Sequence, residues 1–549
     1  MEKVLLNQDK KLILLGNEAI VRGALEAGVQ FVSTYPGTPS SEIGDIFCRI
    51  AKDIGVHFEY STNEKVALES VIGASFSGLK SLAAMKSFGL NVCIDSLLPF
   101  CYTGSKGPTV IIVGDDPSCW SSAQSEQDSR AYSYLAHIPT LEPSDPQECK
   151  DFTKLAFEIS EKFKTPVLIR TTTRVAHQRM PVKLGKLAPY RPAKSGTGAG
   201  FIKDPNRFIT LPPRVLSMKK ELLAKIEKIK EFSEDSKINL IQKDRTSAKS
   251  RLGVITSGVS YLYVREALED LRIDLPILKL GFFYPLPERK IKNFIKSLKE
   301  VLIVEELDPY LEKEVGRLAK NVNCQLKIIG KDFLPEVGEL KPEYIVSALV
   351  KIKGLKFKQK TPVLPSFPRR SPSFCPGCYY RLVFAAVKKV APKNTVFGGD
   401  IGCYMLAGLP PFEIQDYLSC MGSSIGIAHG IKKATDQKLI TFIGDSTFFH
   451  AGIPALINTV FNKSNPLIII LDNQTTAMTG HQPHPGSPQE GEGIKIEDIV
   501  KACGVKNLKI IDPVNAEEME NSIKEFLEKD EVSVIIARRL CWLLSQRKK

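Results

Sequence analysis

Short apolar runs alternate with amphipathic stretches along most of the 549-residue chain. Runs rich in Val, Ile and Leu, such as residues 109–116 (TVIIVGDD) and 466–473 (PLIIILDN), have the length and composition of buried strands. Segments with a helical spacing of apolar positions lie between such runs, for example residues 17–28 (NEAIVRGALEAG). Because strands that alternate with helices are typical of parallel sheets covered by helices, the sequence predicts an α/β fold.

Three blocks of this pattern are separated by two segments of different composition. Residues 191–250 begin with Gly, Pro and Ala and pass into a Lys- and Glu-rich stretch, which predicts a linker with one exposed helix. A Pro-rich bridge (KTPVLPSFPRRSPSFCPGC) precedes the last block. We therefore expect domains at 1–190, 251–355 and 356–549, with 191–250 as the linker.

Composition and charge narrow the class of protein. With 43% hydrophobic and 25% charged residues, the chain has the composition of a globular protein. The net charge of +14 arises from Lys and Arg mixed with acidic residues, without a basic block interleaved with aromatics, so we expect no nucleic-acid binding. The apolar runs are too short to cross a bilayer, so we expect no membrane association. Twelve cysteines without a disulfide framework predict a cytoplasmic protein with free thiols.

Two strand ends carry the most informative side chains. One apolar run ends in Gly444, Asp445 and Ser446, and the next ends in Asn473, 28 positions after the aspartate. Because the carboxyl ends of parallel strands meet at one edge of a sheet, Asp445 and Asn473 are expected to converge there. Their oxygens, with the backbone carbonyl of Thr475, suit Mg²⁺, and Gly444 permits the close approach of a diphosphate.

This pattern resembles the thiamine diphosphate motif, in which Gly-Asp is followed after some two dozen residues by Asn. A Gly-Asp turn alone is common, but here the asparagine stands at the matching spacing after a second apolar strand. Thiamine enzymes need a second domain for the aminopyrimidine ring, and Glu64 heads a predicted helix in the first block. It would hydrogen-bond the ring and so promote formation of the thiazolium carbanion. The alternative is that Glu64 is a solvated acid in the first turn of a helix.

Further segments, in order along nearly the whole chain, resemble the large subunits of indolepyruvate ferredoxin oxidoreductase, which belong to the 2-oxoacid:ferredoxin oxidoreductases. These segments are YPGTPSSE (35–42), STNEKVALE (61–69), SEQDSR (125–130), LEPSDPQE (141–148), RTTTRVAH (170–177), YPLPE (284–288), VEELDPYLE (304–312), GDIGCY (399–404), MGSSIGIAHG (421–430) and TAMTGHQPHPG (476–486).

The resemblance implies a multi-domain thiamine diphosphate fold: a pyrimidine domain and a diphosphate domain, both with parallel sheets, and a transketolase C-terminal-like α/β domain between them. It also implies oxidative decarboxylation of a 2-oxoacid with CoA to an acyl-CoA and CO₂, with electrons passed to ferredoxin through an iron–sulfur cluster. An aryl pyruvate such as indolepyruvate is the expected substrate. A smaller beta- or gamma-type subunit is the expected partner in a hetero-oligomer.

The resemblance also assigns roles to residues of the first block. Glu64 becomes the cofactor-activating acid, and Thr38 in the YPGTP loop faces the substrate carboxylate. Arg170 and Arg174 follow the last strand of the block and can pair with the substrate or with CoA phosphates. The equally weighted alternative is that both arginines form interdomain salt bridges.

In the last block, the resemblance places Gly422 with the cofactor-binding residues. His450, His481 and His484 would lie on loops beside the cofactor, where they could donate to the carboxylate or to a developing enolate. Histidines in loops are more often surface or structural residues, which is the alternative for each of these three.

Four cysteines form a second candidate site. By themselves, Cys375 and Cys378 (CPGC) are compatible with a redox dithiol, with half of a metal site or with a plain turn. The resemblance assigns them, with Cys403 and Cys541, to one [4Fe–4S] cluster; four thiolates would also suit structural zinc. Cys403 and Cys541 have apolar neighbours, so buried core thiols are the alternative.

One expected feature of the family has no counterpart in the sequence. No C-x₂-C-x₂-C-x₃-C run occurs, so we expect the usual two-cluster ferredoxin domain to come from a separate cluster-carrying protein, or the electrons to leave by another route. Two other functions stay open at this point. One is a non-oxidative thiamine-dependent 2-oxoacid decarboxylase, and the other is an inactive relative kept for assembly or regulation.

Overall fold

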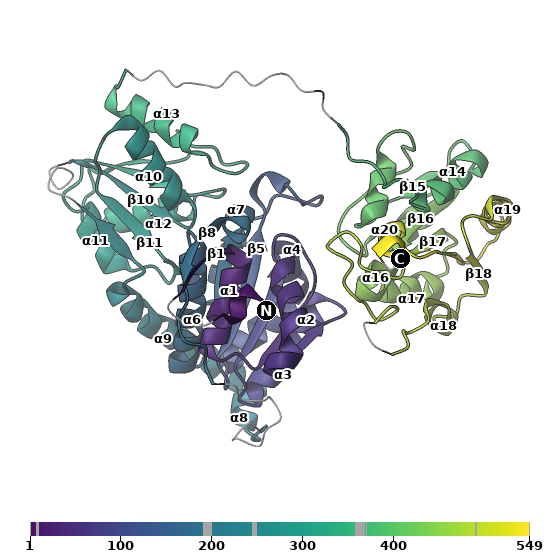
Figure 1. The fold of residues 1–549 in the computed structure, drawn as a ribbon, viewed down its shortest axis with the longest axis horizontal. Coiled ribbons are helices and arrows are strands. Elements are labelled where there is room, and N and C mark those ends of the chain that lie inside the picture. Colours follow the sequence, from purple (N-terminus) through teal and green to yellow (C-terminus); the bar gives the residue numbers. More distant parts are fainter. Residues whose placement is uncertain are drawn as a thin grey trace. The chain divides into compact units, whose positions relative to one another are not determined.

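A computed structural model describes residues 2–6, 10–189, 200–243, 250–356, 368, 370–488 and 491–547. The chain divides into two compact units, Met1–Thr361 and Pro362–Lys549. The boundary lies within the Pro-rich bridge expected from the sequence. Each unit has its own sheets and hydrophobic core (Figure 1).

The first unit contains a seven-stranded sheet with strand order β12-β6-β7-β5-β4-β2-β3. All neighbouring strands are parallel except β12, which runs antiparallel to β6. Its strands are β2 (Phe31–Thr34), β3 (His57–Tyr60), β4 (Ser81–Lys86), β5 (Thr109–Asp115), β6 (Thr140–Leu141), β7 (Val167–Thr172) and β12 (Phe282–Tyr284). The helices around it include α1 (Gly16–Ala27), α2 (Ser41–Ile54), α3 (Glu64–Phe76), α4 (Ser87–Thr103) and α6 (Pro146–Phe163). A short antiparallel pair, β1 (Lys11–Leu15) with β8 (Arg179–Lys183), completes this part.

A second sheet of the first unit has strand order β14-β13-β10-β11-β9. Its elements are β9 (Leu240–Gln242), β10 (Leu252–Ser257), α10 (Ser260–Leu271), β11 (Ile277–Leu280), α11 (Glu288–Ile295), β13 (Glu300–Val304), α12 (Tyr310–Ala319), β14 (Lys327–Ile329) and α13 (Pro342–Lys353). Only β9 is antiparallel to its neighbour. The α/β organisation predicted for 251–355 is therefore present.

The structure differs from the expected division of the chain at three elements. Strand β9 falls in the segment expected as a linker but belongs to the second sheet. Strand β12 belongs by sequence to the 251–355 block but adds to the edge of the seven-stranded sheet. The helix expected in the linker, α9 (Arg214–Asp235), is not exposed all round, because its apolar positions Met218, Leu222 and Ile229 are buried. A helix with one apolar face gains stability by covering that face.

The second unit is a five-stranded, fully parallel sheet with order β15-β16-β17-β19-β18. Its strands are β15 (Val396–Gly398), β16 (Leu439–Gly444), β17 (Leu467–Asp472), β18 (Asn507–Ile511) and β19 (Ser533–Arg538). The helices α14 (Tyr380–Val390) and α19 (Ala516–Leu527) share one core with the sheet, while α15 (Ser424–Ala434), α17 (Ile453–Phe461) and α18 (Ile496–Ala502) share another. Alternate residues of β17 enter opposite cores, since side chains of a strand alternate between faces. The predicted α/β class with parallel sheets is confirmed.

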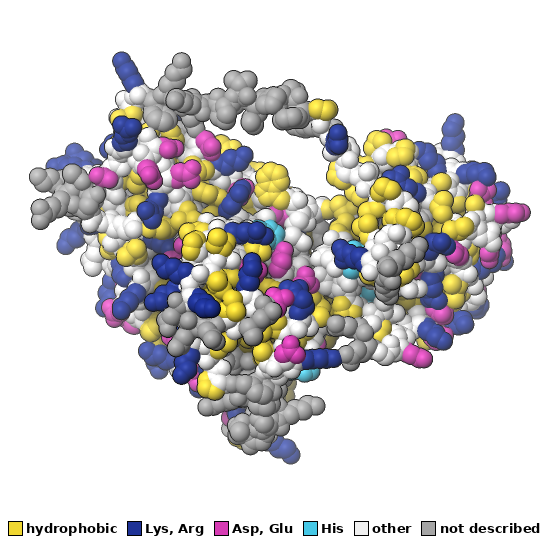
Figure 2. Space-filling model, viewed as in Figure 1, with side chains coloured by type: hydrophobic (Ala, Val, Ile, Leu, Met, Phe, Trp, Pro, Cys, Tyr) yellow, Lys and Arg dark blue, Asp and Glu magenta, His cyan; other side chains and the backbone are white. Residues whose placement is uncertain are grey.

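The surface carries both signs of charge. Figure 2 shows Lys and Arg side chains spread over the visible face among acidic and apolar ones. Within the part of the chain that the structure describes, no helix combines the length and the apolar character that a membrane crossing requires.

Candidate functional site

The structure brings together the two residues at the centre of the diphosphate prediction. Strands β16 and β17 are parallel neighbours, and Asp445 and Asn473 follow directly at their carboxyl ends. The backbone N–H of Asn473 donates to Asp445 Oδ2 at 3.1 Å. Both side chains are buried, with 2% and 6% of their surface exposed. A carboxylate and an amide side chain from separate strands thus meet at one edge of the sheet.

Neighbouring groups hold these two side chains in place. The amide nitrogen of Asn473 donates to the hydroxyl of Tyr380 at 2.8 Å, and its Oδ1 accepts the N–H of Thr475 at 3.0 Å. His484 Nε2 lies 3.1 Å from Asp445 Oδ2. The sequence predicted Thr475 and His484 but gave no reason to single out Tyr380, whose aromatic ring looked like an ordinary core residue of α14.

The glycines of this edge are required by their surroundings. A Cβ at Gly444 would lie 2.8 Å from the ring of Tyr404, and one at Gly422 would lie 2.5 Å from the Cβ of Ala451. Gly422 also has a φ of +86°, which favours glycine. Its N–H donates at 2.8 Å to Asp400, a fully buried carboxylate that also accepts the N–H of Ser424 at 2.9 Å. Sequence analysis did not identify Asp400, although it lies within the quoted GDIGCY segment.

The oxygens at this edge fit a hard cation. Asp445 and Asn473 offer a carboxylate and an amide oxygen, which are ligands that Mg²⁺ accepts together with backbone carbonyls, waters and phosphates. Ser446, which follows Asp445, donates its N–H to Asp445 Oδ1 at 2.8 Å. Across the described ranges, no group of three or more His, Cys, Asp or Glu side chains is arranged as a metal site. The predicted Mg²⁺ site has only one such side chain, the carboxylate of Asp445, because its other ligands are an amide oxygen and a backbone carbonyl.

The four predicted cysteines all lie in the second unit, and their thiols influence one another's ionisation. Burial raises the pKa of Cys403 to about 12, and the neighbouring thiols of Cys378, Cys541 and Cys375 act in the same direction. Burial likewise raises the pKa of Cys378 to about 11, with Cys375 and Cys541 contributing. All four are free and partly buried. The described thiols do not, however, form a group of three or more arranged to hold a metal, so the four-cysteine cluster or zinc site stays a prediction.

Local structure explains how these cysteines are presented. The N–H of Cys378 donates to the carbonyl of Cys375 at 3.1 Å, which closes the turn before α14. Gly377 in this turn has a φ of +77°, and a Cβ there would lie 2.7 Å from the ring of Trp542. At the other end of the chain, the N–H of Cys541 donates to the carbonyl of Asn473 at 3.1 Å. Cys541 is therefore tied through its backbone to the strand end that carries Asn473.

The three histidines take different places. His450 is buried on a π-helical turn (Phe448–Gly452) that follows Asp445. His481 Nε2 lies 3.6 Å from the sulfur of Cys541, and burial together with the charge of Arg547 lowers the pKa of His481. His484 is the histidine in contact with Asp445.

In the first unit, Glu64 occupies the predicted position at the start of a helix. It is the first residue of α3, and the side chain of Asn63 caps this helix by accepting the N–H of Val66 at 2.9 Å. Glu64 is 7% exposed and packs closely on α4, because a Cβ at Gly89 would lie 2.4 Å from its Cγ. A buried acid at the carboxyl edge of a sheet differs from the solvated acid that was the alternative.

Thr38 lies in the loop between β2 and α2, at the same edge of the seven-stranded sheet. The hydroxyl of Ser121 donates to its carbonyl at 3.3 Å.

Both arginines of the substrate prediction form ion pairs. Arg170 is 3% exposed, and its guanidinium lies 2.6 Å from Asp115 and 3.1 Å from Glu142. Arg174 pairs with Glu339 through two hydrogen bonds of 2.7 and 2.8 Å. Glu339 belongs to the 251–355 block, so this contact has the geometry of the interdomain alternative.

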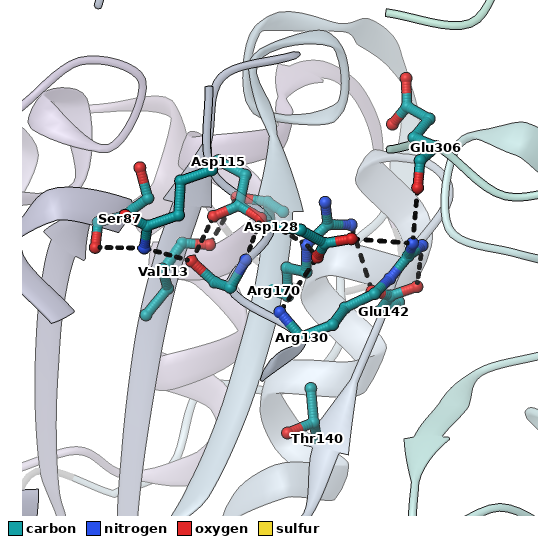
Figure 3. Close-up of polar contacts among 12 residues, drawn as sticks. Ser87, Val113, Asp115, Asp128, Arg130, Thr140, Glu142, Arg170 and Glu306 are labelled. Atoms are coloured by element: carbon teal, nitrogen blue, oxygen red, sulfur yellow. Dashed lines mark hydrogen bonds and ion pairs between the residues drawn. The ribbon is translucent and has the colours of Figure 1, made fainter. Parts of the chain in front are cut away.

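Arg170 belongs to a buried group of charges that joins the two sheets of the first unit (Figure 3). Arg130 donates to Glu142 at 2.7 and 3.0 Å and to the carbonyl of Glu306 at 2.9 Å. The buried group comprises Asp115, Asp128, Arg130, Glu142, Arg170, Glu305 and Glu306, so two guanidinium groups face five carboxyl groups. Sequence analysis included Arg170 but missed this network, because its members are distant along the chain.

Comparison with known proteins places these observations in a family. Residues 22–202 match the family described as pyruvate flavodoxin/ferredoxin oxidoreductase, thiamine diphosphate-binding, and residues 400–537 match the thiamine pyrophosphate enzyme C-terminal TPP-binding domain. A solved 2-oxoglutarate:ferredoxin oxidoreductase from Magnetococcus marinus shares the fold, with a TM-score of 0.51 and 18% identity over 63% of this chain and 65% of that chain.

Curated relatives resemble the chain over nearly its whole length. The indolepyruvate oxidoreductase subunit IorA of Methanothermobacter marburgensis is 44% identical over 97% of this chain and 87% of its own length. The subunit of the same name from Thermococcus kodakarensis is 43% identical over 97% of this chain and 86% of its own length. The chain therefore belongs to the IorA family of indolepyruvate oxidoreductase subunits, built on thiamine diphosphate-binding domains.

Proposed function

We propose that this chain is the thiamine diphosphate-binding subunit of an oxidoreductase that decarboxylates an aryl pyruvate such as indolepyruvate in the presence of CoA. The products would be an acyl-CoA and CO₂, and two electrons would pass via a [4Fe–4S] cluster to ferredoxin. A smaller partner subunit completes the enzyme in this proposal. The observation that carries it is the meeting of Asp445 and Asn473 at one sheet edge, in a chain that belongs to the IorA family.

Residues of the second unit would hold the cofactor. Asp445, Asn473 and the carbonyl of Thr475 provide oxygen ligands for Mg²⁺, and Tyr380 fixes the amide of Asn473 so that its oxygen stays available. Gly422, Gly444 and Ser446 would lie against the diphosphate, as the resemblance to thiamine enzymes implies. Thiamine diphosphate, when bound, supplies the carbanion and electron sink that decarboxylation of a 2-oxoacid requires.

Other side chains of the two units would handle protons and charge. Glu64 would hydrogen-bond the pyrimidine ring of the cofactor and so promote its activation. His450, His481 and His484 are the candidates to donate to the substrate or to a developing enolate; His484 has the added task of orienting Asp445. Thr38 is the candidate for the substrate carboxylate in the first unit. Arg170 and Arg174 stay candidates for substrate or CoA contacts, although their ion pairs favour a structural role.

The four thiols would hold the electron acceptor. Cys375, Cys378, Cys403 and Cys541 have the number and type of ligand that a [4Fe–4S] cluster needs, and the resemblance to the IorA family supports assigning them to one site. When bound, the cluster accepts electrons one at a time. Ferredoxin or a separate cluster-carrying protein is the proposed acceptor beyond it.

Anaerobic purification of the chain with its partner subunit tests the cluster. A brown protein with about four iron and four sulfide per chain is expected from a cubane cluster. Cys378→Ser should lose most of this iron, whereas Cys503→Ser, a partly buried thiol elsewhere in the same unit, should retain it. A colourless wild-type protein that releases CO₂ and an aldehyde without CoA would favour the non-oxidative decarboxylase.

Calorimetric titration with thiamine diphosphate and Mg²⁺ tests the cofactor site. Asp445→Asn should weaken binding at least 10-fold, because it removes the anionic ligand from the cation. Asp436→Asn, at an exposed position of the same unit, should bind like the wild type. Absence of binding by the wild-type complex would leave only the inactive relative. Screening aryl, branched-chain and short 2-oxoacids with CoA and a viologen acceptor then tests the substrate class.

A further inference from the structure

Lys86 is a buried cation at the carboxyl edge of the seven-stranded sheet. It is the last residue of β4, a central strand between β2 and β5, and it directly precedes α4. Only 9% of its surface is exposed. Ligands of parallel α/β sheets bind outside the carboxyl ends of the strands, so the position of Lys86 is one where a ligand would be met.

The segment that begins at Lys86 contacts both predicted active-site elements of the first unit. A Cβ at Gly37, next to Thr38 in the YPGTP loop, would lie 2.8 Å from the Cβ of Lys86. Three residues further on, Gly89 packs against the side chain of Glu64. Lys86 therefore packs against the loop assigned to the substrate, and the helix that follows it packs against the cofactor-activating acid.

The ammonium group of Lys86 is incompletely satisfied by its surroundings. Its Nζ donates to the carbonyl of Ser121 at 3.0 Å and more weakly to the hydroxyl of the same residue at 3.4 Å. Asp116 is the charged group that faces it, but at 3.8 Å it lies beyond hydrogen-bond distance. An ammonium has three donors, so Lys86 has capacity for a further acceptor.

Asp116 is already engaged by other donors. Its Oδ2 accepts from the hydroxyl of Ser122 at 2.6 Å and from the N–H of Ser121 at 2.8 Å, and its Oδ1 accepts from Thr173 at 2.6 Å. Although burial opposes it, the hydrogen bonds from Ser122 and Thr173 hold the pKa of Asp116 below its usual range. Asp116 thus stays ionised and fixed, and does not move in to neutralise Lys86.

The pKa of Lys86 reflects the incomplete hydrogen bonding of its ammonium group. Burial lowers the pKa of Lys86 to about 8, with Asp116 and the thiol of Cys119 acting in the opposite direction. The ring of Phe88 lies 5.3 Å from Nζ and completes a partly apolar environment. At neutral pH the group is still mostly protonated, and a bound anion would stabilise its charge.

The arginines predicted to bind the substrate offer a contrast. Arg170 and Arg174 each have carboxylates at hydrogen-bond distance, namely Asp115 and Glu142 for the first and Glu339 for the second. A substrate carboxylate would have to displace these partners. Among the described residues, the ion-pair partner of Lys86 is Asp116 at 3.8 Å, beyond hydrogen-bond distance, so Lys86 can bind the carboxylate of a ligand without losing a hydrogen bond to a carboxylate.

We propose that Lys86 binds the carboxylate of the 2-oxoacid substrate. The inference rests on the proposed function and adds to it the positively charged side chain that recognises the acid group. Thr38, across the contact at Gly37, would complete the same subsite.

Steady-state kinetics of the complete enzyme test this role. Loss of a charge-assisted hydrogen bond in Lys86→Gln should raise KM for the 2-oxoacid by about 10- to 100-fold. Lys80→Gln, just before the start of the same strand, should leave KM unchanged. Binding of thiamine diphosphate and the circular dichroism spectrum should match the wild type in both variants. An unchanged KM in Lys86→Gln would overturn the inference.

The pH dependence separates a binding role from a merely structural one. In the wild type, affinity for the 2-oxoacid should be full below pH 8 and fall about 10-fold for each pH unit above it, as Lys86 loses its proton. Lys86→Arg keeps its charge at higher pH, so its KM should stay flat from pH 7 to pH 9.5. Parallel pH profiles for the two proteins would refute the assignment, even if Lys86→Gln failed to fold.

A binding measurement without turnover provides an independent readout. In calorimetric titrations, phenylpropionate should bind the wild type about 10- to 100-fold more tightly than the uncharged phenylpropanol, and Lys86→Gln should lose this preference. Equal discrimination by wild type and variant would count against Lys86. If the wild type turned over no 2-oxoacid, the proposed function would fail, and the same titrations would decide separately whether Lys86 is a carboxylate site.

Discussion

Replacing Glu306 by glutamine should change how the stability of the first unit depends on pH. Glu306 follows β13, is 2% exposed and lies in the buried group of charges shown in Figure 3. Its carboxylate accepts the N–H of Leu340 at 3.2 Å. Glutamine has nearly the same shape, its amide oxygen can accept the same hydrogen bond, and it carries no titrating proton. The substitution therefore isolates the ionisation of this one group.

The magnitude follows from linkage between proton binding and folding. Burial raises the pKa of Glu306 from the ordinary 4.5 to about 7, although Arg170 and Arg130 oppose the shift. Between these values the unfolded chain has lost the proton while the folded protein keeps it, so stability falls as pH rises, and it levels off above pH 7. From pH 5 to pH 8 the loss amounts to about 2.5 kcal/mol, at roughly 1.4 kcal/mol per pH unit.

The expected result is that the free energy of unfolding depends more steeply on pH in the wild type than in the variant. Wild type should lose about 2.5 kcal/mol more than Glu306→Gln between pH 5 and pH 8. Burial also raises the pKa of Glu305 to about 7. Glu305 is present in both proteins, so its effect on the difference between them cancels. Glu343→Gln, at an exposed position on α13, serves as the matched control and should follow the wild type.

Unfolding of the first unit can be measured separately from that of the second. In a urea titration, pulse alkylation followed by mass spectrometry reports when buried thiols become accessible. Three fully buried thiols of the first unit serve as reporters: Cys93, Cys101 and Cys149. If the stability difference between Glu306→Gln and wild type stayed constant within about 0.5 kcal/mol from pH 5 to pH 8, the carboxyl would not carry the raised pKa and the reasoning would be wrong.

Three further substitutions test other contacts. Asn63→Ala removes the cap of α3 and should lower the stability of the first unit by about 1 kcal/mol in the same alkylation assay; no change would show that the cap is unimportant. Tyr380→Phe leaves the amide of Asn473 without its partner and should weaken Mg²⁺-thiamine diphosphate binding by about 10-fold in calorimetry, whereas equal affinity would contradict its positioning role. Arg174→Met should cost about 1 kcal/mol of stability without changing KM, because Glu339 loses its partner; an increase in KM with stability intact would instead restore Arg174 as a substrate ligand.

Local sequence patterns were sufficient for the elements and for one site. The apolar runs 438–445 and 466–473 predicted two buried parallel strands, and they are the neighbours β16 and β17. Because parallel strands end at the same edge of a sheet, the positions of Asp445 and Asn473 in the sequence already implied that they meet. The cap and helix start at Glu64 were equally local, since capping depends on residues three positions apart.

Other features depended on contacts between residues far apart in sequence. Whether Arg170 is free or paired depends on Asp115 and Glu142, and whether Lys86 has a carboxylate partner depends on how the loop with Asp116 folds back over β4. Strand β12 joined the sheet of another predicted domain for the same reason. Spacing along the chain determines which residues share a strand end or a helix turn. Burial and ion pairing arise only when distant segments pack, so the tertiary structure alone decided which charged groups are satisfied and which are left for a ligand.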